Sequence, residues 1–164
     1  MKHKVHEESN PYFPLFVSLQ DKRILIVGGG NVAARRASAL VPFGAQLTIL
    51  APDFHKDVQN LPAERICRPY QPGDCAGFAM VLAATNNRAV NHAVYEEATA
   101  LHLPVNVADC PAECSFYFPG IVKEGALVVG VTASGTNHTL ARRATQWLRQ
   151  AIGGFLQTET EGNA

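Results

Sequence analysis

A chain of 164 residues is long enough for one domain of ordinary size, or for one domain with a small appendage. Because 47% of the residues are apolar, the chain can bury a substantial core, and no low-complexity tract indicates disorder. The 14 basic and 14 acidic side chains cancel, so the basic surplus that is typical of nucleic-acid-binding proteins is missing. We therefore expect no nucleic-acid partner.

The first residues, MKHKVHEESNPYFPLF, mix charges of both signs and contain no apolar run of signal-peptide length. No stretch reaches the roughly 18 consecutive apolar residues that a membrane span needs. The four cysteines do not indicate a disulfide scaffold, because this chain can build a core without cross-links. These features predict a soluble cytoplasmic protein with no membrane partner.

Strands and helices alternate along the first two thirds of the chain. Short apolar runs predict strands, and helical spacing of apolar residues predicts two helices between them. The predicted strands cover residues 23–27, 46–50, 66–67, 80–84 and 104–109, and the helices cover residues 31–41 and 86–102. This alternation is typical of βαβ units with right-handed crossovers and a parallel sheet. It predicts a Rossmann-like α/β fold.

The pattern changes after Pro111. Two strand-like runs, SFYFPG and ALVVGVTASG, flank the polar turn IVKEG and predict a β-hairpin, which does not belong in a parallel sheet. A helix is predicted over TNHTLARRATQWLRQAIGGF, ending at the pair Gly153–Gly154 and followed by a frayed tail. We therefore expect a Rossmann-like nucleotide-binding domain at residues 1–111 and a hairpin-and-helix segment at residues 112–164.

A glycine cluster lies between the first predicted strand and the first predicted helix. Gly28, Gly30 and Ala33 match the G-x-G-x-x-G/A pattern of dinucleotide-binding folds. In this pattern Gly28 allows a sharp turn, Gly30 lets the backbone approach a pyrophosphate, and Ala33 lets the helix pack on the sheet. The N–H groups of Asn31 and Val32 then face the phosphates at the positive end of the helix. The sequence thus predicts a dinucleotide cradle.

The residues after the second predicted strand bear on which dinucleotide binds. That strand usually ends in an acidic residue that binds the ribose hydroxyls, whereas here it ends in Leu50-Ala51-Pro52 and Asp53 follows slightly late. Asp53 can either reach a ribose or cap the helix that follows. Because no arginine replaces the acidic residue, NAD is favoured over NADP.

Polar residues also follow the fourth and fifth predicted strands, at the carboxyl edge of the sheet where open α/β folds bind ligands. After the fourth strand come Thr85, Asn86 and Asn87, and either asparagine can cap the next helix while the group contacts a cofactor. Asp109 ends the fifth strand. Its carboxylate could act as a general base, orient a substrate, or form an Asx turn before Pro111.

Weaker signals come from two cysteines and from the last helix. Cys110 and Cys114 form a C-x3-C spacing that matches no common zinc pattern, so we expect packed thiols and no metal site. His138 follows the turn TASGT, which is a second possible anion site. Arg142 lies either on a solvated helix face or against a polycarboxylate substrate.

Four stretches resemble, in order and spacing, the precorrin-2 dehydrogenases, which are the dehydrogenase modules of sirohaem synthases. These stretches are YFPLFVSLQDKRILIVGGGNVAARRASAL, VLAATNNRAVN, PVNVADCPAECSFYFPGIV and LVVGVTASGTNHTLARR. The resemblance covers roughly Tyr12 to Arg143. It implies an NAD-dependent oxidation of the tetrapyrrole precorrin-2 to sirohydrochlorin, a step in sirohaem and related tetrapyrrole synthesis.

The resemblance also implies roles for individual residues. The family's aspartate in the N-V-x-D-x-P motif, implicated in catalysis, falls on Asp109. The family's cofactor contacts fall on the glycine loop and on residues after two strands, namely Gly28, Gly30, Asn31, Val32, Pro52, Asp53 and Thr85. His138 and Arg142 are candidates for substrate binding. The hairpin after Pro111 resembles the part that builds a homodimer in this family.

Two other functions stay open. Some members of the family also insert ferrous iron into sirohydrochlorin at the same site, and a nucleotide- or tetrapyrrole-binding module without turnover is a further alternative. Family members commonly continue into a larger helical region that helps to shape the tetrapyrrole site, whereas this sequence stops soon after one helix. We therefore expect the dehydrogenase activity and leave iron insertion in doubt.

Overall fold

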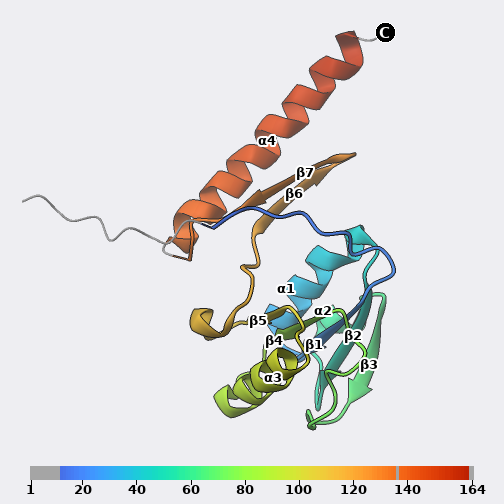
Figure 1. Cartoon of the computed structure of the whole chain (residues 1–164). Coiled ribbons are helices and arrows are strands. Elements are labelled where there is room, and N and C mark those ends of the chain that lie inside the picture. Colours follow the sequence, from blue (N-terminus) through green and yellow to red (C-terminus); the bar gives the residue numbers. More distant parts are fainter. Residues whose placement is uncertain (1–11, 136, 163–164) are drawn as a thin grey trace, which may run out of the picture. The chain divides into compact units, whose positions relative to one another are not determined.

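The computed structural model describes residues 12–135 and 137–162 and divides the chain into two compact units (Figure 1). The larger unit runs from Val17 to Phe116, and the smaller one combines the residues up to Phe16 with the segment from Tyr117 onward. The sequence predicted two domains, at residues 1–111 and 112–164. The two compact units do not test this division into domains, which stays a prediction.

A five-stranded parallel sheet forms the centre of the larger unit. Its strands are β1 (Arg23–Val27), β2 (Gln46–Ala51), β3 (Ala63–Cys67), β4 (Met80–Ala83) and β5 (Val105–Val107). Their order across the sheet is β3-β2-β1-β4-β5, and every pairing is parallel. The predicted Rossmann-like α/β fold is confirmed. Because the chain moves outward from β1 to β3 and then returns to place β4 on the other side of β1, the strand order reverses between β1 and β4.

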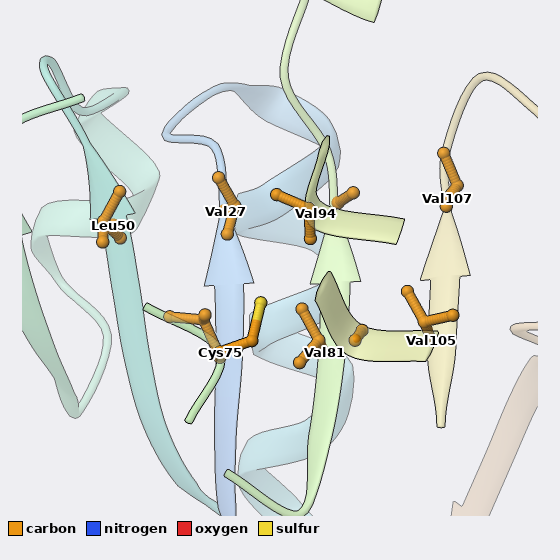
Figure 2. Close-up of a cluster of buried hydrophobic side chains, with 10 residues drawn as sticks. Val27, Leu50, Cys75, Val81, Val94, Val105 and Val107 are labelled. Atoms are coloured by element: carbon orange, nitrogen blue, oxygen red, sulfur yellow. The ribbon is translucent and has the colours of Figure 1, made fainter. Parts of the chain in front are cut away.

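Helices lie between most of the consecutive strands and cover the sheet. They are α1 (Asn31–Leu40), α2 (Lys56–Gln59) and α3 (Arg88–Ala100), with short 3-10 turns at Val41–Phe43 and Pro111–Glu113. A buried cluster that includes Val27, Val81 and Val94 fills the face of the sheet under α3, while α1 lies behind the sheet (Figure 2). Residues 24–27 of β1 are all buried, as expected for a strand that is covered on both faces.

The smaller unit contains the antiparallel hairpin β6 (Gly120–Glu124) and β7 (Leu127–Val131) and the long helix α4 (His138–Gly162). The predicted hairpin is confirmed, but the predicted position of its turn is wrong, because most of the expected turn IVKEG forms β6. The β-branched residues Ile121 and Val122 favour a strand. Gly125 supplies the turn instead, with a φ of +56°, which suits a two-residue hairpin loop.

The predicted end of the last helix is also wrong. Helix α4 continues through Gly153 and Gly154 to Gly162. A glycine inside a helix costs about 1 kcal/mol relative to alanine, which weakens a long helix without stopping it. Among the described residues, none of the helices combines the length and the apolar character of a membrane span.

Candidate active site

The glycine loop joins the carboxyl end of β1 to α1. Gly28 has a φ of +127°, and a Cβ placed there would lie 2.3 Å from the backbone oxygen of Ala84. Only glycine allows this close approach of the loop to the end of β4. Gly30 is different, because a Cβ at this position would meet nothing within 4 Å. The backbone of Gly30 thus faces open space, where a pyrophosphate approaches the backbone in loops of this kind.

Helix α1 begins without a side-chain cap. Gly30 occupies the N-cap position, and the first turn, which starts with Asn31 and Val32, contains no acidic residue. The N–H groups at the start of a ten-residue helix therefore present donors and a partial positive charge to an anion. This arrangement fits the pyrophosphate of a dinucleotide.

Gly29 packs the glycine loop against a neighbouring loop, a role that the sequence reasoning missed. A Cβ on Gly29 would lie 2.0 Å from the carbonyl oxygen of Asp53, and the Gly29 carbonyl accepts a hydrogen bond of 2.8 Å from the backbone N–H of His55. These contacts hold the loop after β2 against the glycine loop. The third consecutive glycine was the available signal, but the G-x-G-x-x-G/A pattern assigns no role to it.

Asp53 follows Pro52 after the end of β2 and is exposed. Its Oδ1 accepts a hydrogen bond of 2.8 Å from the backbone N–H of Phe54. The capping alternative is wrong, because α2 is capped by His55, whose Nδ1 accepts from the N–H of Asp57. The contact of Pro52 and Asp53 with a cofactor stays a prediction.

Thr85 is held by the buried amide of Asn91 on α3. The backbone N–H and the hydroxyl of Thr85 lie 3.0 and 2.7 Å from Asn91 Oδ1, and Asn91 Nδ2 donates to the Thr85 carbonyl at 3.1 Å. The side chain of Asn87 caps α3, which confirms one of the two predicted caps. Because the amide of Asn91 is fully buried and its hydrogen bonds are satisfied, it fixes the loop after β4.

Asp109 lies two residues beyond the end of β5, which is shorter than predicted. Its side chain is 38% exposed, and Oδ1 lies 3.7 Å from Nη1 of Arg88. Arg88 also pairs with Glu113, whose Oε1 lies 2.8 Å from Nδ1 of His92. The hydrogen bond from Arg88, together with the one from His92, holds the pKa of Glu113 below its usual range. Nothing in the sequence singled out Arg88, His92 or Glu113.

The thiol of Cys114 packs against the backbone of β5. Its Sγ lies 3.2 Å from the N–H and 3.3 Å from the carbonyl oxygen of Val107, and burial raises the pKa of the thiol. Cys114 is therefore the packed thiol that the sequence predicted, and Cys110 is half-buried and free. Within residues 12–135 and 137–162, no group of three or more His, Cys, Asp or Glu side chains is arranged to hold a metal ion.

His138 and Arg142 belong to the smaller unit, where both are exposed on α4. The backbone N–H of Leu140 donates to Asn137 Oδ1 at 2.8 Å, so a cap-forming residue precedes this helix as expected. The turn TASGT includes Thr136, which lies outside the described residues. A contact of His138 or Arg142 with a substrate stays a prediction.

The strand order explains why the other predicted residues share one edge of the sheet. The glycine loop, Asp53, Thr85 and Asp109 follow β1, β2, β4 and β5, all of which run in the same direction. Their carboxyl ends therefore meet at one edge, and the reversal of strand order between β1 and β4 marks the place where ligands bind in open α/β sheets.

Comparisons with known proteins identify a family for this chain. The model of a family described as "Putative NAD(P)-binding" matches residues 15–120. The chain belongs to this NAD(P)-binding family. The predicted dinucleotide cofactor is thereby confirmed at the level of the family.

Several curated relatives of this NAD(P)-binding chain are siroheme synthases. The one from Psychrobacter arcticus is 41% identical over 134 residues, which cover 79% of this chain and 24% of that protein. The one from Pseudomonas aeruginosa strain PAO1 is 44% identical over 135 residues, which cover 80% of this chain and 29% of that protein. The chain thus spans less than a third of the length of these relatives.

A solved structure shows the same fold. The precorrin-2 dehydrogenase SirC superposes with a TM-score of 0.71 at 22% sequence identity, covering 85% of this chain and 71% of that one. Because the larger unit contains only residues 17–116, a match that covers 85% of the chain also includes part of the smaller unit.

Proposed function

We propose that the chain is an NAD-dependent precorrin-2 dehydrogenase that oxidises precorrin-2 to sirohydrochlorin in the cytoplasm. The observation that carries this proposal is the meeting of an uncapped helix N-terminus and the Asp109 carboxylate at one edge of the sheet. The names of the siroheme synthase relatives and of SirC support the choice of substrate.

The residues of the glycine loop would hold the cofactor. The N–H groups at Asn31 and Val32 bind the pyrophosphate beside Gly28 and Gly30, and Thr85 contacts the cofactor after β4. Pro52 and Asp53 face the ribose, where a carboxylate accepts hydrogen bonds from hydroxyls and repels the phosphate of NADP. When bound, NAD accepts a hydride.

Asp109 would be the general base of the reaction. Asp109 would accept the proton that precorrin-2 gives up on oxidation, and bound NAD would supply the hydride acceptor, so that sirohydrochlorin, NADH and one proton would be the products. Because the Asp109 side chain is 38% exposed, it can pass this proton to solvent after each turnover. We assign the substrate's carboxylates to His138 and Arg142 on α4, since a guanidinium binds carboxylates well.

The smaller unit would form a homodimer. Leu140, Trp147 and Phe155 on α4 are each more than half exposed in the single chain. A second copy that covers these side chains would remove apolar surface from water. Sedimentation equilibrium tests this proposal, and a monomer at all protein concentrations would contradict it.

The test of the function is an anaerobic assay with enzymatically made precorrin-2 and NAD. We expect NADH and sirohydrochlorin to form in equal amounts. Asp109→Ala should lower kcat by about 100-fold or more, because general-base catalysis contributes about that much, while the Kd for NAD stays within about twofold. Asp109→Asn, which keeps the shape of the side chain, is the matched control for lost packing.

The outcomes of this assay separate the alternatives. Saturable NAD binding without NADH formation would overturn the dehydrogenase and indicate a binding module. Turnover of Asp109→Ala at the wild-type rate would remove Asp109 from the mechanism. Loss of sirohydrochlorin absorbance that depends on added ferrous iron would show that the chain also inserts the metal.

A further inference from the structure

Arg88 lies between two carboxylates at the edge of the sheet that holds the candidate site. It is the first residue of α3, and its Nη2 pairs with Glu113. Its Nη1 lies 3.7 Å from Asp109 Oδ1, which is an ion-pair distance and too long for a hydrogen bond. One side of the guanidinium is thus fixed by Glu113, and the other side faces Asp109.

Glu113 is a well-placed anchor for this arginine. Its side chain is only 13% exposed, and it accepts hydrogen bonds from Arg88 and, at 2.8 Å, from the Nδ1 side of His92. His92 is one helical turn after Arg88, so both side chains leave the same face of α3. The Nε2 of His92 also lies 3.6 Å from Glu96, which adds a second carboxylate to the histidine.

We propose that Arg88 is the positioning residue of Asp109, with Glu113 and His92 as its anchor. This inference rests on the proposed role of Asp109 as general base. Asp109 lies in a loop beyond β5, where no strand pairing restrains it, and a base on a loop needs an orienting partner. Arg88 is its only ion-pair partner within residues 12–135 and 137–162.

The length of the contact suits this role. A strong hydrogen bond to Arg88 would occupy the lone pairs with which Asp109 accepts a proton, whereas an ion pair at 3.7 Å limits the position of the carboxylate and leaves its oxygens available. Because the side chains of Arg88 and Asp109 are 46% and 38% exposed, the ion pair between them contributes little to folding. Variants of Arg88 should therefore fold, and their effect should be kinetic.

The experiment measures steady-state kinetics of Arg88→Met, Arg88→Lys and Glu113→Gln in the anaerobic assay. We expect Arg88→Met to lower kcat by about tenfold, with the KM values for NAD and precorrin-2 within about twofold of the wild type. Arg88→Lys should recover part of this loss, since lysine keeps the charge but cannot bridge both carboxylates. Glu113→Gln should lower kcat because Arg88 loses its anchor.

Two further variants show whether Arg88 acts through Asp109. The double variant Arg88→Met with Asp109→Ala should be no slower than Asp109→Ala alone, because the positioning residue has nothing left to position. Arg65→Met removes an exposed arginine on β3, the outer strand farthest from β5 in the sheet, and should keep the wild-type kcat.

Each contrary outcome has a distinct meaning. A wild-type kcat in Arg88→Met, together with a slow Asp109→Ala, would overturn the positioning role and leave the proposed function intact. A higher KM for precorrin-2 with an unchanged kcat would also overturn it and assign Arg88 to substrate binding. Additive losses in the double variant would show that Arg88 acts independently of Asp109. A wild-type protein that forms no NADH would overturn both proposals.

Discussion

The two units of the chain differ in how they bury apolar side chains. Among the described residues, the larger unit holds nearly all of the buried ones, including the whole of the cluster drawn in Figure 2. Of the residues whose burial is described, the smaller unit contributes only Val122 and Thr145 to the buried set. It carries most of the large apolar side chains that are exposed, with Phe13 at 87% and Trp147 at 66%.

This difference separates two tasks. The larger unit obtains its stability from its own core and can therefore hold the glycine loop and Thr85 in fixed positions. The smaller unit exposes apolar side chains on α4, which the proposed homodimer would cover. Changes in the larger unit should act on folding and NAD binding, and changes on the surface of α4 should act on assembly.

The largest effect should come from Gly28→Ala in the larger unit. Alanine would combine an unfavourable positive φ with a Cβ only 2.3 Å from the Ala84 oxygen. Strain and overpacking together cost roughly 2–6 kcal/mol of the free energy of unfolding, a large part of the stability of a typical domain. Urea denaturation followed by circular dichroism measures this loss. Unchanged stability would contradict the close approach of the glycine loop to β4.

Gly30→Val is the matched control in the same loop. Gly30 has an extended backbone that any residue can adopt, and a Cβ there meets nothing within 4 Å. We expect its free energy of unfolding to change by less than about 1 kcal/mol. Its affinity for NAD, measured by calorimetry, should fall at least about tenfold because the side chain occupies the pyrophosphate position. Normal NAD binding by Gly30→Val would remove the loop from the cofactor site.

A second pair of variants compares the two units directly. Val81→Ala removes two methyl groups from a fully buried position in β4 and should cost about 1–3 kcal/mol of stability without changing the oligomeric state. Trp147→Ser removes an exposed ring from α4 and should weaken self-association while the parallel-sheet unit stays as stable as before. Denaturation and sedimentation equilibrium on both variants test the separation. Equal effects of the two variants on both measurements would contradict it.

The sequence predicted best those features that depend on short stretches of chain. The run of buried residues in β1, the start of α1 after Gly30 and the cap by Asn87 follow from local patterns of apolar, glycine and polar residues. The G-x-G-x-x-G/A pattern follows the first strand, and the carboxyl ends of parallel strands lie together. The pattern therefore also predicted which edge of the sheet carries the other candidate residues.

The features that the sequence did not predict depend on distant residues or on competing local signals. Two of these features join distant segments. Gly29 and Asp53 are 24 residues apart, and the ion-paired residues Arg88 and Glu113 are 25 apart. No periodic pattern in the sequence indicates such pairs. The hairpin was misplaced because Lys123 and Glu124 suggested a turn, although they lie on a strand. The two glycines in α4 suggested a helix end, although a long helix tolerates their cost.

The smallest effect should be a dependence of the larger unit's stability on alkaline pH. Burial, with a smaller contribution from Glu97, raises the pKa of the Cys75 thiol to about 12, whereas a free thiol titrates at roughly 8.5. Below a pH of about 8.5, the buried neutral thiol therefore makes its full contribution to stability. Above that pH the thiol ionises in the unfolded chain, and about 1–2 kcal/mol of the contribution is lost by pH 10. Under reducing conditions, Cys75→Ala should lose less stability between pH 7 and pH 10 than the wild type by about this amount, measured by urea denaturation. Val81→Ala introduces no change in titratable groups and should keep the wild-type pH dependence, so an equal slope in all three proteins would show that the Cys75 thiol does not cause it.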